Sequence, residues 1–169
     1  MRQLLHNEIK NQKPNAQLSI LANNMHSPFN VGSLFRLADN LGIEKLYFSG
    51  NSVYPPNRKI AKTSRATEQY VNFEYVENPV EIIKKLKRED YKIISVEYCD
   101  KSKEIEQLSL HKDEKILLIL GEENRGVADE LLKLSDEVFH INMYGKTTSM
   151  NVINACTIVS YEILKQIKP

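Results

Sequence analysis

The sequence contains little cysteine. Only Cys99 and Cys156 occur among 169 residues, and Cys156 lies within an apolar helical pattern, where a buried thiol behaves as a small hydrophobic side chain. A chain of this length forms one ordinary domain and can bury a core without disulfides or bound metal. We therefore predict no metal site, and the cysteine usage is typical of a reducing cytoplasm.

The sequence also lacks an apolar run long enough to span a membrane. Residues 1–13 mix Arg, Gln, His, Asn and Lys with a few aliphatic side chains, and this composition does not match an export signal. We therefore expect a cytoplasmic protein without membrane-spanning segments.

The sequence has no excess of charge of one sign: it contains 23 Lys and Arg and 22 Asp and Glu, and the formal net charge is +1. Affinity for nucleic acid would have to come from a local basic cluster rather than from overall basicity. The charged fraction of 27% and the hydrophobic fraction of 41% are ordinary for a globular protein. The composition therefore argues against disordered and fibrous classes.

Short apolar runs alternate with helical patterns along the chain. The run Ile116–Leu120 is aliphatic throughout, which is typical of a strand buried on both faces of a parallel sheet. The predicted strands are Leu18–Ala22, Lys45–Ser49, Lys92–Glu97, Ile116–Leu120 and Val138–Ile141. The predicted helices run from Pro28 to Gly42, around Ile82–Leu86, over Ala128–Leu134 and over Val152–Ile167.

This alternation predicts an α/β fold, with a single-domain open parallel sheet flanked by helices. Ligands of such sheets bind at the carboxyl ends of the strands, where several glycine-containing loops occur. We assign residues 18–169 to this domain and residues 1–17 to a short N-terminal extension.

The loop Gly121–Gly126 follows a buried strand and imitates a phosphate-binding loop. Such a loop needs Lys and then Ser or Thr after its second glycine, but Val127 and Ala128 stand there. The adjacent acids Glu122 and Glu123 would repel a triphosphate, whereas a cationic ligand such as a sulfonium suits them. A plain strand-to-helix turn with solvated acids is the alternative.

The stretch Ile141–Ala155 combines a strand end, a glycine turn, three hydroxyl residues and a helix. The sequence Gly145-Lys146-Thr147 is not a phosphate-binding loop, because His140 stands where the earlier glycine is required. One interpretation is helix capping by Thr147, Thr148 or Ser149. The other is that exposed backbone N–H groups bind an adenine edge or a carboxylate. Because this loop and Gly121–Gly126 both follow buried strands at one sheet edge, we expect them to form a single pocket.

Two further stretches carry candidate residues. In Met25–Gly42, Asn30 is expected to cap a helix, and Arg36, flanked by apolar side chains, is expected to point into a cleft unless it is an ordinary surface residue. In Pro55–Arg65, a predicted polar loop, a basic cluster could bind RNA phosphates with salt-dependent affinity, although such runs are usually only solvated. The cluster consists of Arg58, Lys59, Lys62 and Arg65.

Together these stretches resemble the motif set of the SpoU/TrmH family of the SPOUT methyltransferase superfamily. The resemblance covers about residues 18–165. It rests on Asn30, Gly32 and Arg36 in a first motif, on Gly121, Glu123 and Gly126 in a second, and on Ile141, Met143, Gly145, Ser149, Asn151 and Val152 in a third. Two departures occur in the third motif: Asn142 replaces the usual Pro, and Met150 replaces the usual Leu, a change that conserves volume.

The resemblance implies an RNA 2′-O-ribose methyltransferase that uses S-adenosylmethionine, with a C-terminal trefoil knot and an active site built across a homodimer. It implies that Gly121, Ile141, Met143, Ser149 and Met150 bind the cofactor. It gives Arg36 the central catalytic role, with Asn30, Glu123, Ser149 and Asn151 as further catalytic residues. Glu97 ends a neighbouring strand and is a further candidate, but it matches no family motif.

An Arg side chain is essentially always protonated, so we expect Arg36 to bind an RNA phosphate and stabilise the developing alkoxide rather than act as a simple base. A catalytically inactive RNA-binding protein of the same fold is the alternative, and a nucleotide-binding regulator is disfavoured by the two failed phosphate loops. The resemblance leaves tRNA and rRNA open as targets, with tRNA favoured for so small a version. Target choice is expected to depend on the core domain or the dimer.

Overall fold

A computed structural model describes residues 1–5, 8–9 and 17–167. About half of the predicted extension, residues 1–17, therefore lies outside the described residues. The strands are β1 (Leu18–Asn23), β2 (Lys45–Ser49), β3 (Phe73–Val76), β4 (Tyr91–Val96), β5 (Lys103–Glu104), β6 (Lys115–Leu120) and β7 (Glu137–His140). The helices are α1 (Pro28–Leu41), α2 (Arg58–Ser64), α3 (Pro79–Arg88), α4 (Asp129–Leu132) and α5 (Val152–Ile167), with short 3₁₀ turns η2 (Thr67–Gln69) and η3 (Ile105–Gln107).

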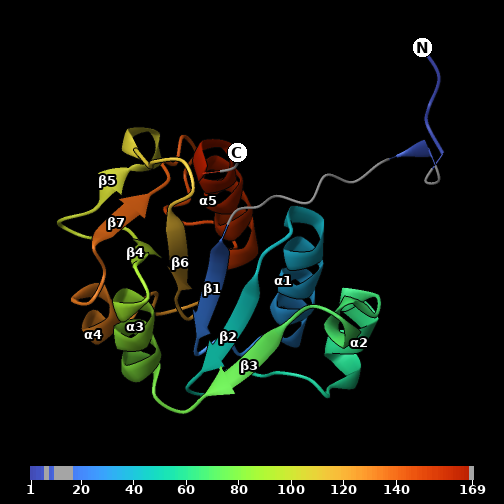
Figure 1. Cartoon of the computed structure of the whole chain (residues 1–169), viewed down its shortest axis with the longest axis horizontal. Helices are drawn as coiled ribbons and strands as arrows, with labels where there is room; N and C mark the ends of the chain where they lie inside the picture. Colours follow the sequence, from blue (N-terminus) through green and yellow to red (C-terminus); the bar gives the residue numbers. More distant parts are fainter. Residues whose placement is uncertain (6–7, 10–16, 168–169) are drawn as a thin grey trace.

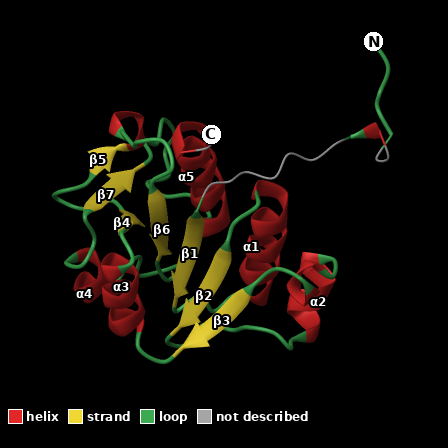
Figure 2. Cartoon of the chain, viewed as in Figure 1, coloured by secondary structure: helices red, strands yellow, loops and turns green. Residues whose placement is uncertain are grey.

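The strands form one parallel sheet in the order β3-β2-β1-β6-β4-β7-β5 (Figures 1 and 2). This confirms the predicted open parallel α/β sheet. From β1 the chain adds β2 and β3 toward one side of the sheet, and it then crosses to β4 on the other side of β1 and β6. Ligands of open parallel sheets bind where the strand order reverses in this way. None of the helices in the described ranges is long and apolar enough to cross a bilayer.

Helices cover both faces of the sheet. Side chains of β6 alternate between two apolar clusters, as the period of two requires. Leu118 belongs to the cluster that includes residues of α1, α2 and α5, and Leu117 belongs to the cluster that includes residues of α3 and α4. Cys156 of α5 is fully buried, and this burial raises the pKa of its thiol to about 12. The predicted behaviour of this cysteine as a small core residue is confirmed.

The predicted polar loop Pro55–Arg65 is wrong over most of its length, because Arg58–Ser64 is the helix α2. Its N-cap is Asn57, whose side chain accepts hydrogen bonds from the backbone of Lys59 and Ile60. Ile60 is the only large apolar side chain that α2 buries. A helix held by one apolar anchor has no hydrophobic period, so pattern analysis does not detect it.

Several other boundaries differ from the prediction. Strands β3 and β5 were not predicted, since β3 is a short strand with half-exposed residues and β5 has only two residues. The helix predicted over Ala128–Leu134 is limited to Asp129–Leu132, with Ala128 as its N-cap. Asn30 does not cap α1: Ser27 does, and its hydroxyl accepts a hydrogen bond from the backbone N–H of Asn30.

Candidate active site

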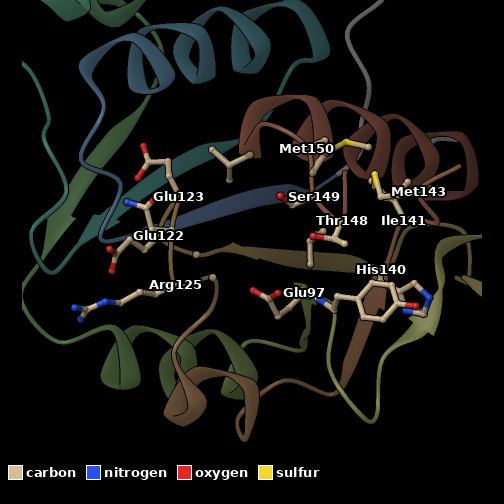
Figure 3. A pocket seen from close by; sticks show the side chains of 17 residues that line it. Glu97, Glu122, Glu123, Arg125, His140, Ile141, Met143, Thr148, Ser149 and Met150 are labelled. Carbon is tan, nitrogen blue, oxygen red and sulfur yellow. Dashed lines mark hydrogen bonds between the residues drawn. The ribbon is translucent and has the colours of Figure 1, made fainter. Parts of the chain in front are cut away.

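A pocket of about 330 Å³ lies at the carboxyl ends of β4, β6 and β7 (Figure 3). Its walls come from the Gly121–Gly126 loop and from the Tyr144–Met150 loop together with the residues that precede and follow it. The prediction that these two loops form one pocket is confirmed. All five predicted cofactor-binding residues line it: Gly121, Ile141, Met143, Ser149 and Met150.

The Gly121–Gly126 loop is a tight turn whose two glycines are both required by the geometry. Glu122 and Gly126 exchange two backbone hydrogen bonds of 2.9 Å. A Cβ on Gly121 would lie 2.0 Å from the carbonyl carbon of Gly126, and Gly126 itself has φ +70°. Only glycine allows this close approach and this left-handed conformation without strain.

Glu97 holds the same loop from the end of β4. Its Oε2 accepts a 2.8 Å hydrogen bond from the backbone N–H of Val127, and its Oε1 accepts one of 2.9 Å from that of Tyr98. A Cβ on Gly126 would lie 1.9 Å from Glu97 Oε2. Figure 3 shows Glu97 within the pocket, between Arg125 and His140. The sequence signal for this residue is its place directly after a strand, at the edge where ligands bind.

Three polar side chains from three distant stretches are joined by hydrogen bonds. Asn30 Nδ2 donates to Glu123 Oε1 over 3.0 Å, and Asn151 Nδ2 donates to Asn30 Oδ1 over 3.1 Å. Asn151 Oδ1 in turn accepts a 2.8 Å hydrogen bond from the backbone N–H of Ile153, at the start of α5. The side chain that caps α5 is therefore Asn151, and the expectation of a cap from Thr147, Thr148 or Ser149 is wrong.

The Glu123 carboxylate accepts three hydrogen bonds. The backbone N–H groups of His26 and Ser27 donate to it over 3.3 and 3.1 Å, in addition to Asn30. Partial burial raises the pKa of Glu123, but the hydrogen bonds from Asn30 and from the backbone outweigh this effect, so that the pKa is lowered overall. Glu123 is therefore an anion at neutral pH and a weak proton acceptor.

Arg36 does not belong to the pocket of its own chain. It is exposed on α1 and is absent from the residues that line the pocket. Asn30 lies six residues earlier on the same helix, and at 3.6 residues per turn the two side chains point about 120° apart. The structure thus brings together four of the five predicted catalytic residues, Asn30, Glu123, Ser149 and Asn151, and leaves Arg36 on the surface instead of in a cleft.

The predicted RNA-binding cluster is a basic surface on and just after α2. Arg58, Lys59 and Lys62 lie on the helix, Arg65 is its C-cap, and all four side chains are exposed. Within the described ranges, no group of three or more His, Cys, Asp or Glu side chains is arranged to hold a metal ion.

Comparisons with known proteins give a consistent result. A relative from Aquifex aeolicus, named tRNA (guanosine(18)-2′-O)-methyltransferase, is 28% identical over 92% of this chain and 72% of its own length. A relative from Borreliella burgdorferi, named uncharacterized tRNA/rRNA methyltransferase, is 30% identical over 92% of this chain and 67% of its own length.

The fold is shared with solved structures. The SpoU methyltransferase AviRb from Streptomyces viridochromogenes, in complex with the cofactor AdoMet, superposes with a TM-score of 0.79 at 23% identity. The match covers 98% of this chain and 62% of that one. The sequence profile of the SpoU rRNA Methylase family matches residues 17–161. The chain therefore belongs to the SpoU rRNA Methylase family.

Proposed function

We propose that this chain transfers a methyl group from S-adenosylmethionine to a ribose 2′-hydroxyl of RNA. The observation that carries the proposal is the hydrogen-bonded series Asn151–Asn30–Glu123, which joins all three family motifs beside the pocket. The 2′-O-methyltransferase names of its relatives agree with it.

The pocket suits S-adenosylmethionine. Gly121 and Gly126 let the loop fold tightly on itself at the wall of the pocket, and we assign the adenosyl group to backbone around Gly121, Ile141 and Met150. Glu122 and Glu123 supply negative charge for a cationic ligand. The chemistry that S-adenosylmethionine supplies when bound is an electrophilic methyl group on a sulfonium. The relative AviRb has been solved with this cofactor.

The residues of this chain position the acceptor and stabilise the charge that develops on it. Glu123 is a poor base because its pKa is lowered, so its role is to hold Asn30 and, through Asn30, Asn151 in place. Ser149 and Asn151 orient the ribose. Arg36 binds the neighbouring phosphate and stabilises the negative charge that develops on the 2′-oxygen, and the 2′-hydroxyl proton passes to that phosphate.

Arg36 takes part in such a site only if two copies combine, because it lies outside the pocket of its own chain. A homodimer supplies this arrangement. Large apolar side chains remain exposed on the neighbouring helices α1 and α5 (Figure 1): Phe29 is 57% exposed, and Ile158 and Tyr161 are 43% and 60% exposed. These side chains, on two helices that contact each other, are available to a second copy of the chain. The proposal includes the C-terminal trefoil knot of the family, in which the two pocket loops wind together.

The proposed target is tRNA, as in the name of the Aquifex relative, although other relatives are named for rRNA. The basic surface around α2 supplies phosphate contacts. The proposed compartment is the cytoplasm, since Cys99 and Cys156 are both free thiols.

The decisive test uses Arg36→Ala. Methyl transfer from radiolabelled S-adenosylmethionine to tRNA should be abolished in the variant, while calorimetry should show cofactor binding close to that of the parent. Equal activity of variant and parent on a confirmed RNA substrate would remove Arg36 from the mechanism. Mapping 2′-O-methyl sites in RNA from cells with and without the gene identifies the target nucleotide.

Calorimetry also separates the competing functions. The parent should bind S-adenosylmethionine and not ATP. Binding of ATP would favour a nucleotide-binding regulator, and RNA binding without any methyl transfer would favour an inactive RNA-binding protein.

A further inference from the structure

Two tyrosines form an exposed stacked pair that the proposed chemistry does not use. The rings of Tyr54 and Tyr75 lie 4.8 Å apart between centroids and 28° from parallel. They remain 42% and 36% exposed and belong to neither apolar cluster. The Tyr75 hydroxyl donates a 2.9 Å hydrogen bond to the carbonyl of Gly50, which fixes one ring against the end of β2. The pair is thus an ordered aromatic surface that does not belong to the hydrophobic core.

Like the pocket, the pair lies at the end of the sheet that the carboxyl ends of the strands form. Tyr54 follows β2, and Tyr75 is close to the carboxyl end of β3 (Figure 1). Hydrogen bonds tie this edge together: Val53 N–H donates to Met25 O over 3.0 Å, and Asn51 N–H donates to Asn24 Oδ1 over 2.9 Å. The next residues along that segment, His26 and Ser27, bind Glu123. Short loops therefore fix the position of the tyrosines relative to the active site.

The segment that follows Tyr54 is positively charged. Residues 50–67 contain four basic side chains, Arg58, Lys59, Lys62 and Arg65, and no acidic one. Among the described residues, none of these four forms a salt bridge. Their charge is available to a polyanion.

A hollow of about 540 Å³ lies between the segment that follows Tyr54 and the segment that leads into β3. Pro55 and Pro56, which directly follow Tyr54, form one side, together with Arg58. Phe73 also lines it, and it lies on the same face of β3 as Tyr75, because alternate residues of a strand share a face. Glu68 also lines the hollow, and its carboxylate accepts a hydrogen bond from the Ser64 hydroxyl. Arg58 is the basic side chain that the hollow offers to a phosphate.

We infer that Tyr54 and Tyr75 form a stacking platform for an unpaired RNA base near the target nucleotide, while α2 holds the adjoining phosphates. Aromatic side chains beside basic ones are the usual means of binding single-stranded RNA, because every base has a face that can stack. A duplex offers no free base face to such a pair. The inference rests on the proposed function, and it adds that the substrate is unpaired around the methylated nucleotide.

The test compares Tyr54→Leu and Tyr75→Leu with the parent and with Tyr70→Leu. Tyr70 is a matched control, since it is 66% exposed but lies before the amino end of β3, at the other end of the strand from the pair. The probe is a short single-stranded oligouridylate that carries one 2-aminopurine, whose fluorescence is quenched when its base stacks on an aromatic ring. The Tyr54 and Tyr75 variants should bind it roughly tenfold more weakly and lose the quenching, and Tyr70→Leu should behave as the parent.

Three outcomes overturn the inference. They are parent-like affinity and quenching in both Tyr54→Leu and Tyr75→Leu, equal affinity of the parent for the single strand and for its duplex, and absence of quenching by the parent. The last two measurements need no variant, so they stand even if a substitution prevents folding. Methyl transfer to tRNA by the parent tests the proposed function separately. Methyl transfer without base stacking would refute only the stacking platform. Base stacking without methyl transfer would refute only the proposed enzymatic function.

Discussion

The side-chain amide of Asn151 donates a 3.1 Å hydrogen bond to Oδ1 of Asn30, a residue 121 positions earlier in the chain. Because Asn30 Nδ2 donates to Glu123, both polar ends of one amide are occupied by residues of two other motifs. The orientation of Asn30 is therefore fixed by its partners: only the nitrogen can face the carboxylate. Each residue of the series depends on the next for its position.

Removal of Asn30 should therefore remove most of what Asn151 contributes. Asn30→Ala is expected to lower kcat at least about tenfold, because the ribose is no longer held in position. Asn151→Ala should cost much less in the Asn30→Ala background than in the parent, with a coupling energy of about 0.5–3 kcal/mol. Single-turnover methyl transfer by the four proteins measures the cycle. Strictly additive losses would show that the two amides act independently.

The lowered pKa of Glu123 predicts an acid-dependent loss of stability. The group has a pKa of 4.5 when unperturbed, and a lower one in the folded chain. Above about pH 4.5 the carboxylate is ionised in both states and its full stabilisation is present. As the pH falls further, the unfolded chain takes up the proton first, and the stabilisation is lost.

Glu123→Gln tests this pH dependence. The difference in the free energy of unfolding between parent and variant should be largest near about pH 7 and should shrink below about pH 4.5. Urea denaturation at several pH values measures it. The difference between the two proteins is the informative quantity, because other acids with lowered pKa, such as Glu137 and Glu162, contribute equally to both. A difference that stays constant with pH contradicts the proposed ionisation of Glu123.

Most of the fold could be predicted because its central strands are aliphatic and its long helices have an apolar stripe. Strand Ile116–Leu120 and helix Val152–Ile167 are of this kind. Helix α2 could not be predicted, since Ile60 is its only large buried apolar side chain and its capping residue, Asn57, stands in a stretch rich in turn-forming residues. Strand β3 lies at the sheet edge with half-exposed residues, so alternation is weak there.

The candidate site was predictable as a set of loops but not as a set of contacts. The order of the motifs identified Asn30, Glu123 and Asn151, whereas their mutual hydrogen bonds depend on how β1, β6 and α5 are placed in space. Glu97 belongs to none of the motifs, and its role is seen only from the hydrogen bond that it accepts from the backbone N–H of Val127. Arg36 was expected in a cleft because its sequence neighbours are apolar, but those neighbours turn inward and leave it exposed.

Two motif glycines should fail in different ways when replaced by alanine. In Gly121→Ala the new Cβ would meet backbone of Gly126 at 2.0 Å, so the pocket loop has to move. In Gly32→Ala the new Cβ would meet Thr63 Cβ at 2.7 Å and Ile60 O at 2.9 Å, which pushes α2 away from α1. Overpacking of this kind costs about 1–3 kcal/mol.

Calorimetry with S-adenosylmethionine and thermal unfolding distinguish the two effects. Gly121→Ala should lose cofactor affinity by more than about tenfold, which corresponds to about 1.4 kcal/mol. Gly32→Ala should lower Tm while its cofactor affinity stays close to the parent value, because α2 is not part of the pocket. Equal cofactor affinity in Gly121→Ala and the parent would mean that the loop tolerates the displacement.

Glu97 should act on the cofactor through the loop that it holds. Glu97→Ala leaves the backbone N–H of Val127 without its partner, at a cost of about 1–3 kcal/mol for an unsatisfied group. Glu97→Gln retains a carbonyl oxygen that can accept this bond, so it should keep most of the stability and cofactor affinity that Glu97→Ala loses. Hydrogen exchange at the amide of Val127 reports the loop directly: fast in the alanine variant, and slow in the parent and the glutamine variant. If Glu97→Gln loses cofactor affinity as fully as Glu97→Ala while this amide remains protected, the carboxylate charge itself, and not the hydrogen bond to Val127, is what the pocket requires.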